Sequence, residues 1–409
     1  MAIRSGGGLE LMSSPRLLKV GVLLSGREQF SPFYGGALAR WTYEVYSRLR
    51  DRMEVTVFGF PTSAEHLYDL SHRSSRVWRA CDVIYKIPFL RRWDEPLWLR
   101  GLMRSLRHLD VVHIHNRPQW VRRLRRLGFR GAIWLHLQNN HLGHWTAAML
   151  DALAPQLDGV AVCSSFLRGT FADRSPSLAA KTKVIFNGVN TQLFTPREDI
   201  REAKTIFFVG RFDEEKGILQ LVRAYARLLE RHPDAALVIG GTTGFGVHRE
   251  TDYVRKVRDL AQSLVSNQNA RIDFPGYIHH DKDLPAWFQR ATIFSSPSLF
   301  QEPFGLVNAE AMACATPVVG SNRGGIPEVL GDAGILVNPE DVEKFAAALS
   351  SLLEKPDYRA SLGRAAYLRS RKMFDWDVIA GHWASILEEG EGESDSVRTF
   401  PSANSVRQF

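Results

Sequence analysis

Short apolar runs rich in β-branched residues alternate with longer amphipathic stretches along almost the whole chain. Near-continuous hydrophobicity within each run is typical of strands buried on both faces, as in parallel sheets. The amphipathic stretches between the runs, such as residues 37–49, predict helices. This alternation predicts βαβ units and therefore a doubly wound α/β sheet. The runs of the first half lie at residues 19–26, 55–60, 111–116, 132–137, 159–165 and 183–189.

The alternation is interrupted once, by a segment of turn-forming and charged residues, and then resumes. Two Rossmann-like sheets joined by one linker are the simplest explanation of this interruption. The later runs lie at residues 205–211, 235–241, 271–278, 292–298, 316–322 and 333–338. We expect a flexible N-terminus (1–18), a first domain (19–190), a linker (191–204), a second domain (205–372), a last helix (373–389) and a disordered tail (390–409).

The composition is that of a globular protein. Hydrophobic residues make up 44% of the 409 residues and charged residues 23%, so a large core can form. No run approaches the about 18 apolar residues of a membrane span, and the first residues lack the apolar segment of a signal peptide. The three cysteines are far apart and fit neither a disulfide framework nor a zinc site. We therefore expect a cytoplasmic protein; the cysteines are Cys81, Cys163 and Cys314.

The net charge of +8 is concentrated in the basic first half of the chain. A basic surface attracts phosphate on nucleic acid, anionic lipid or acidic glycan. Nucleic acid is disfavoured because no aromatic–basic interleaving or reader motif accompanies the charge. A solvated helix face and peripheral contact with an anionic membrane both remain open. The densest cluster consists of Arg122, Arg123, Arg125, Arg126 and Arg130.

Two cations follow the first strand predicted in the second domain. Ligands of doubly wound sheets bind at the carboxyl ends of strands. Arg211 ends this strand, and Lys216 stands just before the next predicted helix. Together they can neutralise a diphosphate, Arg211 through its planar guanidinium and Lys216 as a point charge. Cations that flank a turn are more often solvated, so this pair alone is a weak signal.

Two carboxylates flank a predicted helix start in the segment SLFQEPFGLVNAEAMA. Glu302 precedes a helix expected to begin near Phe304, and Glu310 lies roughly 9 Å further along its axis. Between them, helix N–H groups offer an anion site that the helix dipole supports. Carboxylates bind sugar hydroxyls well, so this order matches a sugar, a diphosphate and a ribose. The three N–H groups belong to Gly305, Leu306 and Val307.

These segments together resemble the donor-binding signature of glycosyltransferase family 4. The resemblance rests on EPFGLVNAEAMA, on GRFDEEKG about ninety residues upstream and on SNRGGIPEV downstream. It extends over nearly the whole chain, and the joint occurrence of the three motifs is highly specific. Within the family, HIHNRPQWVRRL and SNRGGIPEV look closest to glycosyltransferases of bacterial spore coats and surface polysaccharides.

The resemblance implies the GT-B fold, in which two Rossmann-like domains face a cleft, and transfer of a sugar from a nucleotide diphosphate sugar with retention of configuration. No cofactor and no metal are implied, and the acceptor would be a glycan, a lipid-linked molecule or another surface-polysaccharide precursor. Arg211 and Lys216 would hold the diphosphate, Glu302 the transferred sugar and Glu310 the ribose. The N–H groups after Pro303 would assist Glu302. The donor-binding set is completed by Tyr277, Ile278, Phe304, Gly305, Leu306 and Val307, the first two meeting the base.

The first domain contributes fewer predicted site residues. Gly35 and Gly36, in the loop SPFYGG, would let the backbone approach phosphate or acceptor. An isolated glycine pair is more often only a turn. His136 corresponds to a histidine that the family places beside the donor sugar, whereas a lone strand histidine is usually a core or surface residue. No carboxylate in the first-domain loops suggests a covalent nucleophile, which favours front-face substitution with the departing phosphate as base.

Metal binding is disfavoured at two places where the sequence offers possible ligands. His113, His115, His141 and His144 have HxH and HxxH spacings but no carboxylate or cysteine partner nearby. Two DxD patterns are interpreted as acids at helix starts. They are Asp281 with Asp283, and Asp375 with Asp377.

Three rival functions share the predicted architecture. Nucleotide-sugar epimerases and sugar phosphorylases are enzymes of this kind, and a coat or scaffold protein could retain the fold only for binding. No pyridoxal-phosphate lysine site is recognisable, which weakens the phosphorylase hypothesis. The intact cations and carboxylates of the predicted donor site weaken the scaffold hypothesis. Donor consumption that requires an acceptor would distinguish a transferase from an epimerase.

Overall fold

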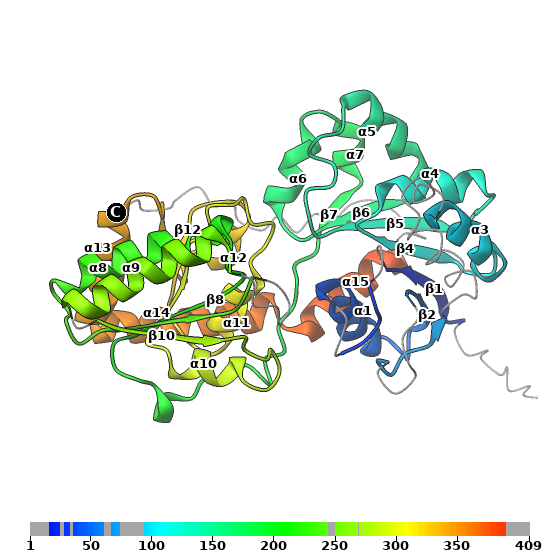
Figure 1. Ribbon diagram of the computed structural model, residues 1–409. Helices are drawn as coiled ribbons and strands as arrows, with labels where there is room; N and C mark the ends of the chain where they lie inside the picture. Colours follow the sequence, from blue (N-terminus) through cyan, green and yellow to red (C-terminus); the bar gives the residue numbers. More distant parts are fainter. Residues whose placement is uncertain are drawn as a thin grey trace, which may run out of the picture.

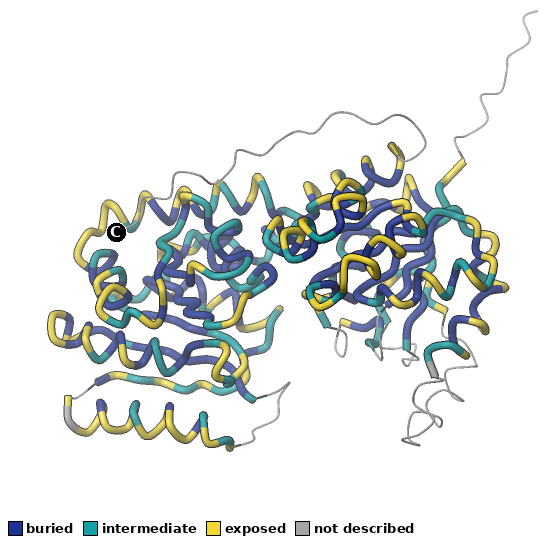
Figure 2. Tube along the Cα trace, turned by 90° about the horizontal axis from the view of Figure 1, so that it is seen from above, coloured by how far each residue is buried: buried dark blue, intermediate teal, exposed yellow. Residues whose placement is uncertain are grey.

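The computed structural model describes residues 16–24, 28–32, 36–60, 67–73, 94–243, 250–268 and 270–389. They form two α/β domains, each built on one parallel sheet (Figure 1). Strands make up the buried interior, and exposed residues gather on the outer helices (Figure 2). The predicted fold class, two doubly wound parallel sheets, is confirmed.

The first domain contains a sheet of seven strands in the order β3-β2-β1-β4-β5-β6-β7. All of its neighbouring strands are parallel. β3 has only two residues, too few for an apolar run, and the sequence pattern missed it. The strands are β1 (Leu18–Leu23), β2 (Met53–Phe58), β3 (His72–Arg73), β4 (Val111–His115), β5 (Ala132–Leu137), β6 (Gly159–Val162) and β7 (Thr182–Val184).

The second domain contains six parallel strands in the order β10-β9-β8-β11-β12-β13. In both sheets the strand order reverses once, between β1 and β4 and between β8 and β11. Ligands of open α/β sheets bind at such reversals. The strands are β8 (Thr205–Val209), β9 (Ala236–Gly240), β10 (Arg271–Gly276), β11 (Ile293–Ser296), β12 (Val318–Ser321) and β13 (Ile335–Val337).

Side-chain caps begin several of the helices. Ser164 starts α6 by accepting a hydrogen bond from the Leu167 N–H, and Asp341 starts α13 by accepting one from the Lys344 N–H. The first domain has α1 (Ala37–Ser47), α3 (Asp94–Leu106), α4 (Pro118–Arg126), α5 (Ala147–Leu153), α6 (Ser165–Ala172) and α7 (Pro176–Ala180). The second has α8 (Ile218–Leu229), α9 (Asp252–Gln268), α10 (Leu284–Arg290), α11 (Leu306–Ala313), α12 (Ile326–Leu330), α13 (Val342–Glu354) and α14 (Pro356–Met373).

The last helix, α15 (Trp376–Glu389), returns to the first domain and packs beside α1 (Figure 1). The Trp383 indole N–H donates to the Tyr46 hydroxyl at 2.9 Å. Where the chain turns back, the Val189 N–H donates to the Phe374 carbonyl at 2.6 Å. The C-terminal helix therefore belongs to the core of the first domain.

Candidate active site

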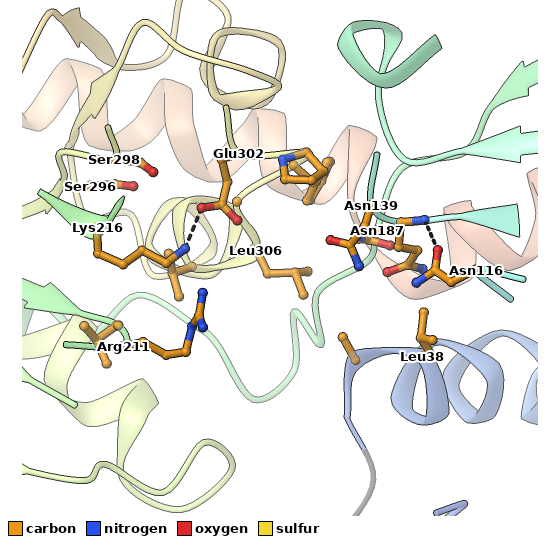
Figure 3. Close-up of a pocket in the computed structure, with 18 of the residues that line it drawn as sticks. Leu38, Asn116, Asn139, Asn187, Arg211, Lys216, Ser296, Ser298, Glu302 and Leu306 are labelled. Carbon is orange, nitrogen blue, oxygen red and sulfur yellow. Dashed lines mark hydrogen bonds and ion pairs between the residues drawn. The ribbon is translucent and has the colours of Figure 1, made fainter. Parts of the chain in front are cut away.

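A cleft of about 640 Å³ lies between the domains, at the two strand reversals. The second domain forms one wall from residues that follow β8 and β11, together with the start of α11. The first domain forms the opposite wall from the residues after β4 and β5 and the start of α1 (Figure 3).

Lys216 and Glu302 form an ion pair at the centre of the second-domain wall (Figure 3). The Lys216 Nζ lies 2.6 Å from the Glu302 Oε2, and each side chain is 21% exposed. The turn that carries Lys216 requires glycine at the next position. Gly217 has a φ of +68°, and a Cβ there would lie 1.9 Å from the Pro297 carbonyl oxygen. The structure thus brings together two predicted site residues that are 86 positions apart.

Arg211 also lines the cleft but is held less firmly. Its side chain is 60% exposed and pairs with Asp213 at 3.2 Å and with Glu215 at 4.0 Å. Exposed pairs of this kind hold a side chain weakly. Arg211 is therefore free to turn toward a ligand that enters the cleft.

The loop that carries Glu302 is packed against a pair of glycines. A Cβ at Gly324 would lie 2.2 Å from the Glu302 carbonyl oxygen, and one at Gly325 would lie 2.3 Å from that of Pro303. The Gly325 N–H donates to the Glu302 carbonyl at 2.7 Å. This close approach explains why the SNRGGIPEV and EPFGL segments occur together in the sequence.

Helix α11 begins at Leu306, two residues later than predicted, because Gly305 precedes it in the left-handed conformation (φ +87°). Leu306 and Val307 line the cleft together with Gly305. The first N–H groups of a helix have no acceptor within it, so this end of α11 can bind an anion. Phe304 lines the cleft, but its buried ring packs against Phe186 and Phe374.

Glu310 does not line the cleft, contrary to prediction. It is only 5% exposed, and its Oε1 pairs with the His280 Nε2 at 2.7 Å. Its other oxygen is buried and has no hydrogen-bond partner among the described residues. Burial lowers the pKa of His280, but the Glu310 and Asp281 carboxylates outweigh this effect and raise it to about 9. His280 is therefore protonated at neutral pH.

Asp281 extends this pair into the first domain. It pairs with Arg40 at 2.7 Å, and the His280 ring lies 2.7 Å from its Oδ1. Hydrogen bonding from His280 lowers the pKa of Asp281 despite partial burial. The helix-start interpretation is thus wrong for Asp281, whereas Asp375 does accept the Asp377 N–H at the start of α15. We call Arg40, Asp281, His280 and Glu310 the interdomain chain.

Two predicted base-binding residues lie at the end of β10, outside the cleft lining. Tyr277 is 51% exposed. Ile278 is buried against Gly240, where a Cβ would lie 2.4 Å from its side chain. Both remain predictions.

The glycines predicted in the first domain receive no support as ligand contacts. Gly35 lies outside the described residues. Gly36 precedes α1 and packs close to the Glu28 carboxylate, which accepts a hydrogen bond from the Ala39 N–H at 2.8 Å. Glu28 itself lines the cleft. Glu28 is missing from the predicted site because no motif accompanies it in the sequence.

Side-chain amides dominate the rest of the first-domain wall (Figure 3). The Asn116 Oδ1 accepts the Gln138 N–H at 2.8 Å, and the buried Gln138 side-chain nitrogen has no partner within the part of the chain that the structure describes. Sequence reasoning missed these residues, although the carboxyl ends of β4 and β5 could have pointed to them. We call Asn116, Gln138, Asn139 and Asn187 the amide group.

His136 is wrongly predicted to face the cleft. It is fully buried beneath α1, with its ring centroid 4.5 Å from that of Trp41. Gln138, which follows the end of β5, lines the cleft instead. Burial lowers the pKa of His136 to about 3, which keeps its ring neutral.

Comparisons with known proteins identify the family. The model for glycosyltransferase family 4 matches residues 34–193, and the model for glycosyl transferases group 1 matches residues 192–369. The chain belongs to glycosyltransferase family 4. Its GT-B fold is that of Anabaena Alr3699/HepE solved with UDP and glucose (TM-score 0.69, 21% identity, 91% of this chain and 100% of that one).

Two curated proteins show how far the likeness of this glycosyltransferase extends. It is 26% identical to spore coat protein SA of Bacillus subtilis, over 91% of this chain and all of that protein. It is 36% identical to D-inositol 3-phosphate glycosyltransferase of Corynebacterium kroppenstedtii, over 48% of this chain and 43% of that protein. The higher identity over about half of each chain is consistent with a more variable remainder.

A second contact joins the two domains of the glycosyltransferase. The Ser164 hydroxyl donates to the Pro303 carbonyl at 2.6 Å, and the Glu328 carboxylate accepts the Ser165 N–H at 2.7 Å. Burial raises the pKa of Glu328, against the effect of these Ser165 hydrogen bonds. Glu328 lies in the SNRGGIPEV segment, so this motif links the glycosyltransferase domains.

The arginine cluster of the glycosyltransferase lies on and after α4. Arg125 is only partly exposed there, and it donates to the Gly131 carbonyl at 2.7 Å and pairs with Asp158 at 2.9 Å. Arg122, Arg126 and Arg130 are exposed. Within the described residues, no helix has the length and hydrophobicity required to span a membrane.

Proposed function

We propose that the chain is a retaining, metal-independent hexosyltransferase that transfers a sugar from a nucleotide diphosphate sugar to a hydroxyl of a glycan, lipid-linked or other surface-polysaccharide acceptor. The observation that carries the proposal is the Lys216–Glu302 pair beside the start of α11, inside an interdomain cleft. This arrangement combines a cation, an anion-binding helix terminus and a hydroxyl-binding carboxylate.

The leaving diphosphate would occupy the second-domain wall. Lys216 would exchange part of its contact with Glu302 for a phosphate oxygen, and the exposed Arg211 would turn in beside it. The N–H groups of Leu306 and Val307 would add fixed dipoles. Charge on the diphosphate rises as its bond to the sugar breaks, so preorganised positive groups stabilise the transition state more than the bound donor.

The transferred sugar would contact Glu302, whose carboxylate oxygens accept hydrogen bonds from hydroxyls. Ser296 and Ser298 line the same wall and offer further hydroxyl contacts (Figure 3). The ribose would bind the partnerless Oε2 of Glu310 after a local rearrangement at His280, with the base near Tyr277 and Ile278. The UDP and glucose in Anabaena Alr3699/HepE support a UDP-hexose as the first donor to test.

The acceptor would lie along the first-domain wall, where the amide group provides neutral donors and acceptors. Glu28 is the carboxylate that this wall adds to the cleft. Its hydrogen bond from the Ala39 N–H anchors it at α1, so we assign it to binding of an acceptor hydroxyl. Retention would then proceed at the front face of the sugar, with the departing phosphate taking the proton.

A panel of nucleotide sugars tests the function. Thermal shifts identify the donor, and release of nucleotide diphosphate is then measured with and without candidate acceptors. Acceptor-dependent release with a retained anomeric configuration is expected. Isomerisation of the donor without an acceptor would instead identify an epimerase, and binding without turnover would identify a non-catalytic protein.

A separate experiment tests the front-face mechanism. Glu28→Gln should keep substantial activity and retention, because the proposed role of Glu28 is binding. Loss of activity that azide restores with inverted product would identify Glu28 as a covalent nucleophile and refute the front-face mechanism.

A further inference from the structure

Three histidines that the function leaves unexplained meet inside the first domain. His113 and His115 are two residues apart on β4 and therefore lie on the same face of the strand. His136 on β5 is the register partner of His115. All three are fully buried, and their candidate ligand nitrogens lie within 4.8 Å of one another. Trp41 of α1 and Trp383 of α15 contact the same rings. We call these three residues the histidine cluster.

Several buried ring nitrogens of the histidine cluster lack a hydrogen-bond partner in the part of the protein that is described. His113 Nε2, His115 Nδ1 and both ring nitrogens of His136 have no hydrogen-bond partner among the described residues. Buried polar groups in native proteins are nearly always paired, and an unpaired set is a sign of a bound water or ion. Neutral imidazole nitrogens are the commonest protein ligands for transition metals.

The remaining ring nitrogens face outward to hydroxyl groups. The His113 Nδ1 lies 2.9 Å from the Tyr46 hydroxyl, and the His115 Nε2 lies 3.2 Å from the Thr42 hydroxyl. A histidine that binds a metal through one nitrogen typically uses the other for such an outer contact, which fixes its tautomer. The outer contacts therefore leave Nε2 of His113 and Nδ1 of His115 for a common ligand.

We propose that His113, His115 and His136 form a buried site for one divalent transition-metal ion of the zinc class. Three histidines with a water or hydroxide as the fourth ligand are an established zinc environment. Zinc–nitrogen bonds of about 2.0–2.1 Å place the ligand nitrogens roughly 3.4 Å apart in a tetrahedron. Ligand nitrogens that lie up to 4.8 Å apart would therefore move closer together when the ion binds.

The ion has a structural role. It ties β4 to β5 beneath α1, while the Trp383–Tyr46 hydrogen bond connects the site to α15. Asn116 directly follows His115, and Gln138 stands two residues after His136. The metal thus stiffens the wall that presents the amide group. Sequence spacing alone gave no sign of this site, because His136 is distant in sequence from His113 and His115, whereas His141 and His144 lie in the loop after β5, outside the cluster.

The first test measures metal content in the untagged full-length protein, since a polyhistidine tag would itself bind metal. After incubation with zinc and dialysis, we expect about one zinc per chain by mass spectrometry. His136→Ala should lose this zinc, whereas His108→Ala, which removes an exposed histidine of the same domain, should keep it. Wild-type protein without bound zinc, or a His136→Ala protein that retains it, would overturn the proposal.

Two measurements keep the proposal testable if His136→Ala does not fold. X-ray absorption of the zinc-loaded wild type should show imidazole nitrogens at about 2.0–2.1 Å. Tyr46→Phe removes an outer contact and should weaken zinc binding by about 10–100-fold. Zinc should also raise the melting temperature in proportion to the logarithm of its concentration, and magnesium should not. An absorption spectrum without imidazole ligands, or equal melting temperatures with both metals, would refute the site.

Discussion

The two walls of the cleft use different chemistry. The second-domain wall is charged, with the Lys216–Glu302 pair and Arg211 beside the start of α11. The first-domain wall presents mainly neutral amides, with Glu28 and Arg117 at its edge. Charge suits a diphosphate, whose negative charge increases during transfer. Neutral amides discriminate by hydrogen-bond geometry, as an acceptor hydroxyl requires. We therefore expect the second-domain wall to promote the reaction and the first-domain wall to select the acceptor.

The largest effect should follow loss of a cation from the second-domain wall. Lys216→Ala and Arg211→Ala should each lower kcat by about tenfold or more, because they remove stabilisation of the leaving diphosphate. Donor affinity should fall as well. Lys216→Ala should be the more severe, since it also leaves Glu302 without its partner. Steady-state kinetics with the donor and acceptor check both variants.

Lys344→Ala is the matched control, because it removes a 71%-exposed lysine on α13, away from the cleft. It should behave like the wild type. If the cleft variants also retained wild-type turnover, the diphosphate would not bind at this wall.

The fold was predictable because buried parallel strands leave a direct pattern in the sequence. The run at 132–137 matches β5 residue for residue. β3 was missed because two residues are too few to show a hydrophobic pattern. Site prediction was right about location at Lys216 and Glu302, which pair in the cleft because charge and backbone geometry coincide there, and their ligand roles stay predictions. It failed where position depends on packing: Glu310 is covered by His280, and His136 by Trp41. Amides such as Gln138 have no sequence signature.

The two carboxylates of the second domain should separate by function. Glu302→Gln changes the carboxylate that we propose contacts the transferred sugar, and it should lower kcat by about tenfold. Glu310→Gln should raise the donor KM several-fold with a smaller change in kcat, because the ribose does not change during transfer. Glu310 is buried and paired with His280, so this variant should also lower the melting temperature. If Glu310→Gln abolished turnover while Glu302→Gln stayed active, the donor would lie along α11 in the opposite direction, with its sugar rather than its ribose near Glu310.

Substitutions in the first-domain wall should weaken acceptor binding rather than lower turnover. Gln138→Ala removes an amide whose buried nitrogen has no hydrogen-bond partner in the described parts of the chain. A neutral hydrogen bond contributes about 0.5–1.5 kcal/mol, so the acceptor KM should rise about 2–12-fold while donor KM stays unchanged. Asn140→Ala changes a neighbouring exposed amide that does not line the cleft and serves as control. A raised donor KM in Gln138→Ala would show that the first-domain wall also binds the donor, contrary to the proposed separation of roles.

The interdomain chain should make stability depend on pH. The pKa of His280 is raised from 6.5 to about 9, so its protonated form stabilises the folded state. This contribution is complete below pH 6.5 and is lost as pH rises through about 9. His280→Gln should therefore melt a few degrees below the wild type near pH 6.5, and the difference should shrink by pH 10. A difference that grows with pH would mean that neutral His280 is the stabilising form.

The smallest effect on catalysis should come from the exposed arginines of the first domain. Arg122, Arg126 and Arg130 lie on or just after α4, away from the cleft lining. Their joint replacement by Gln should leave turnover of a water-soluble acceptor unchanged. If the basic first domain docks on anionic membrane, the same variant should bind acidic vesicles at least about tenfold more weakly, and salt should weaken wild-type binding.

The matched control for charge replaces Arg364, Arg371 and Lys372 by Gln, which removes three exposed cations from α14 of the second domain. Vesicle sedimentation with and without acidic lipid compares the two variants. Equal losses of vesicle binding in both variants would mean that net charge alone determines binding. Unchanged binding of the first variant would mean that the arginine cluster is only a solvated helix face. A loss confined to the first variant would place the membrane against the domain that selects the acceptor, and a lipid-linked acceptor would then reach the amide group from that side.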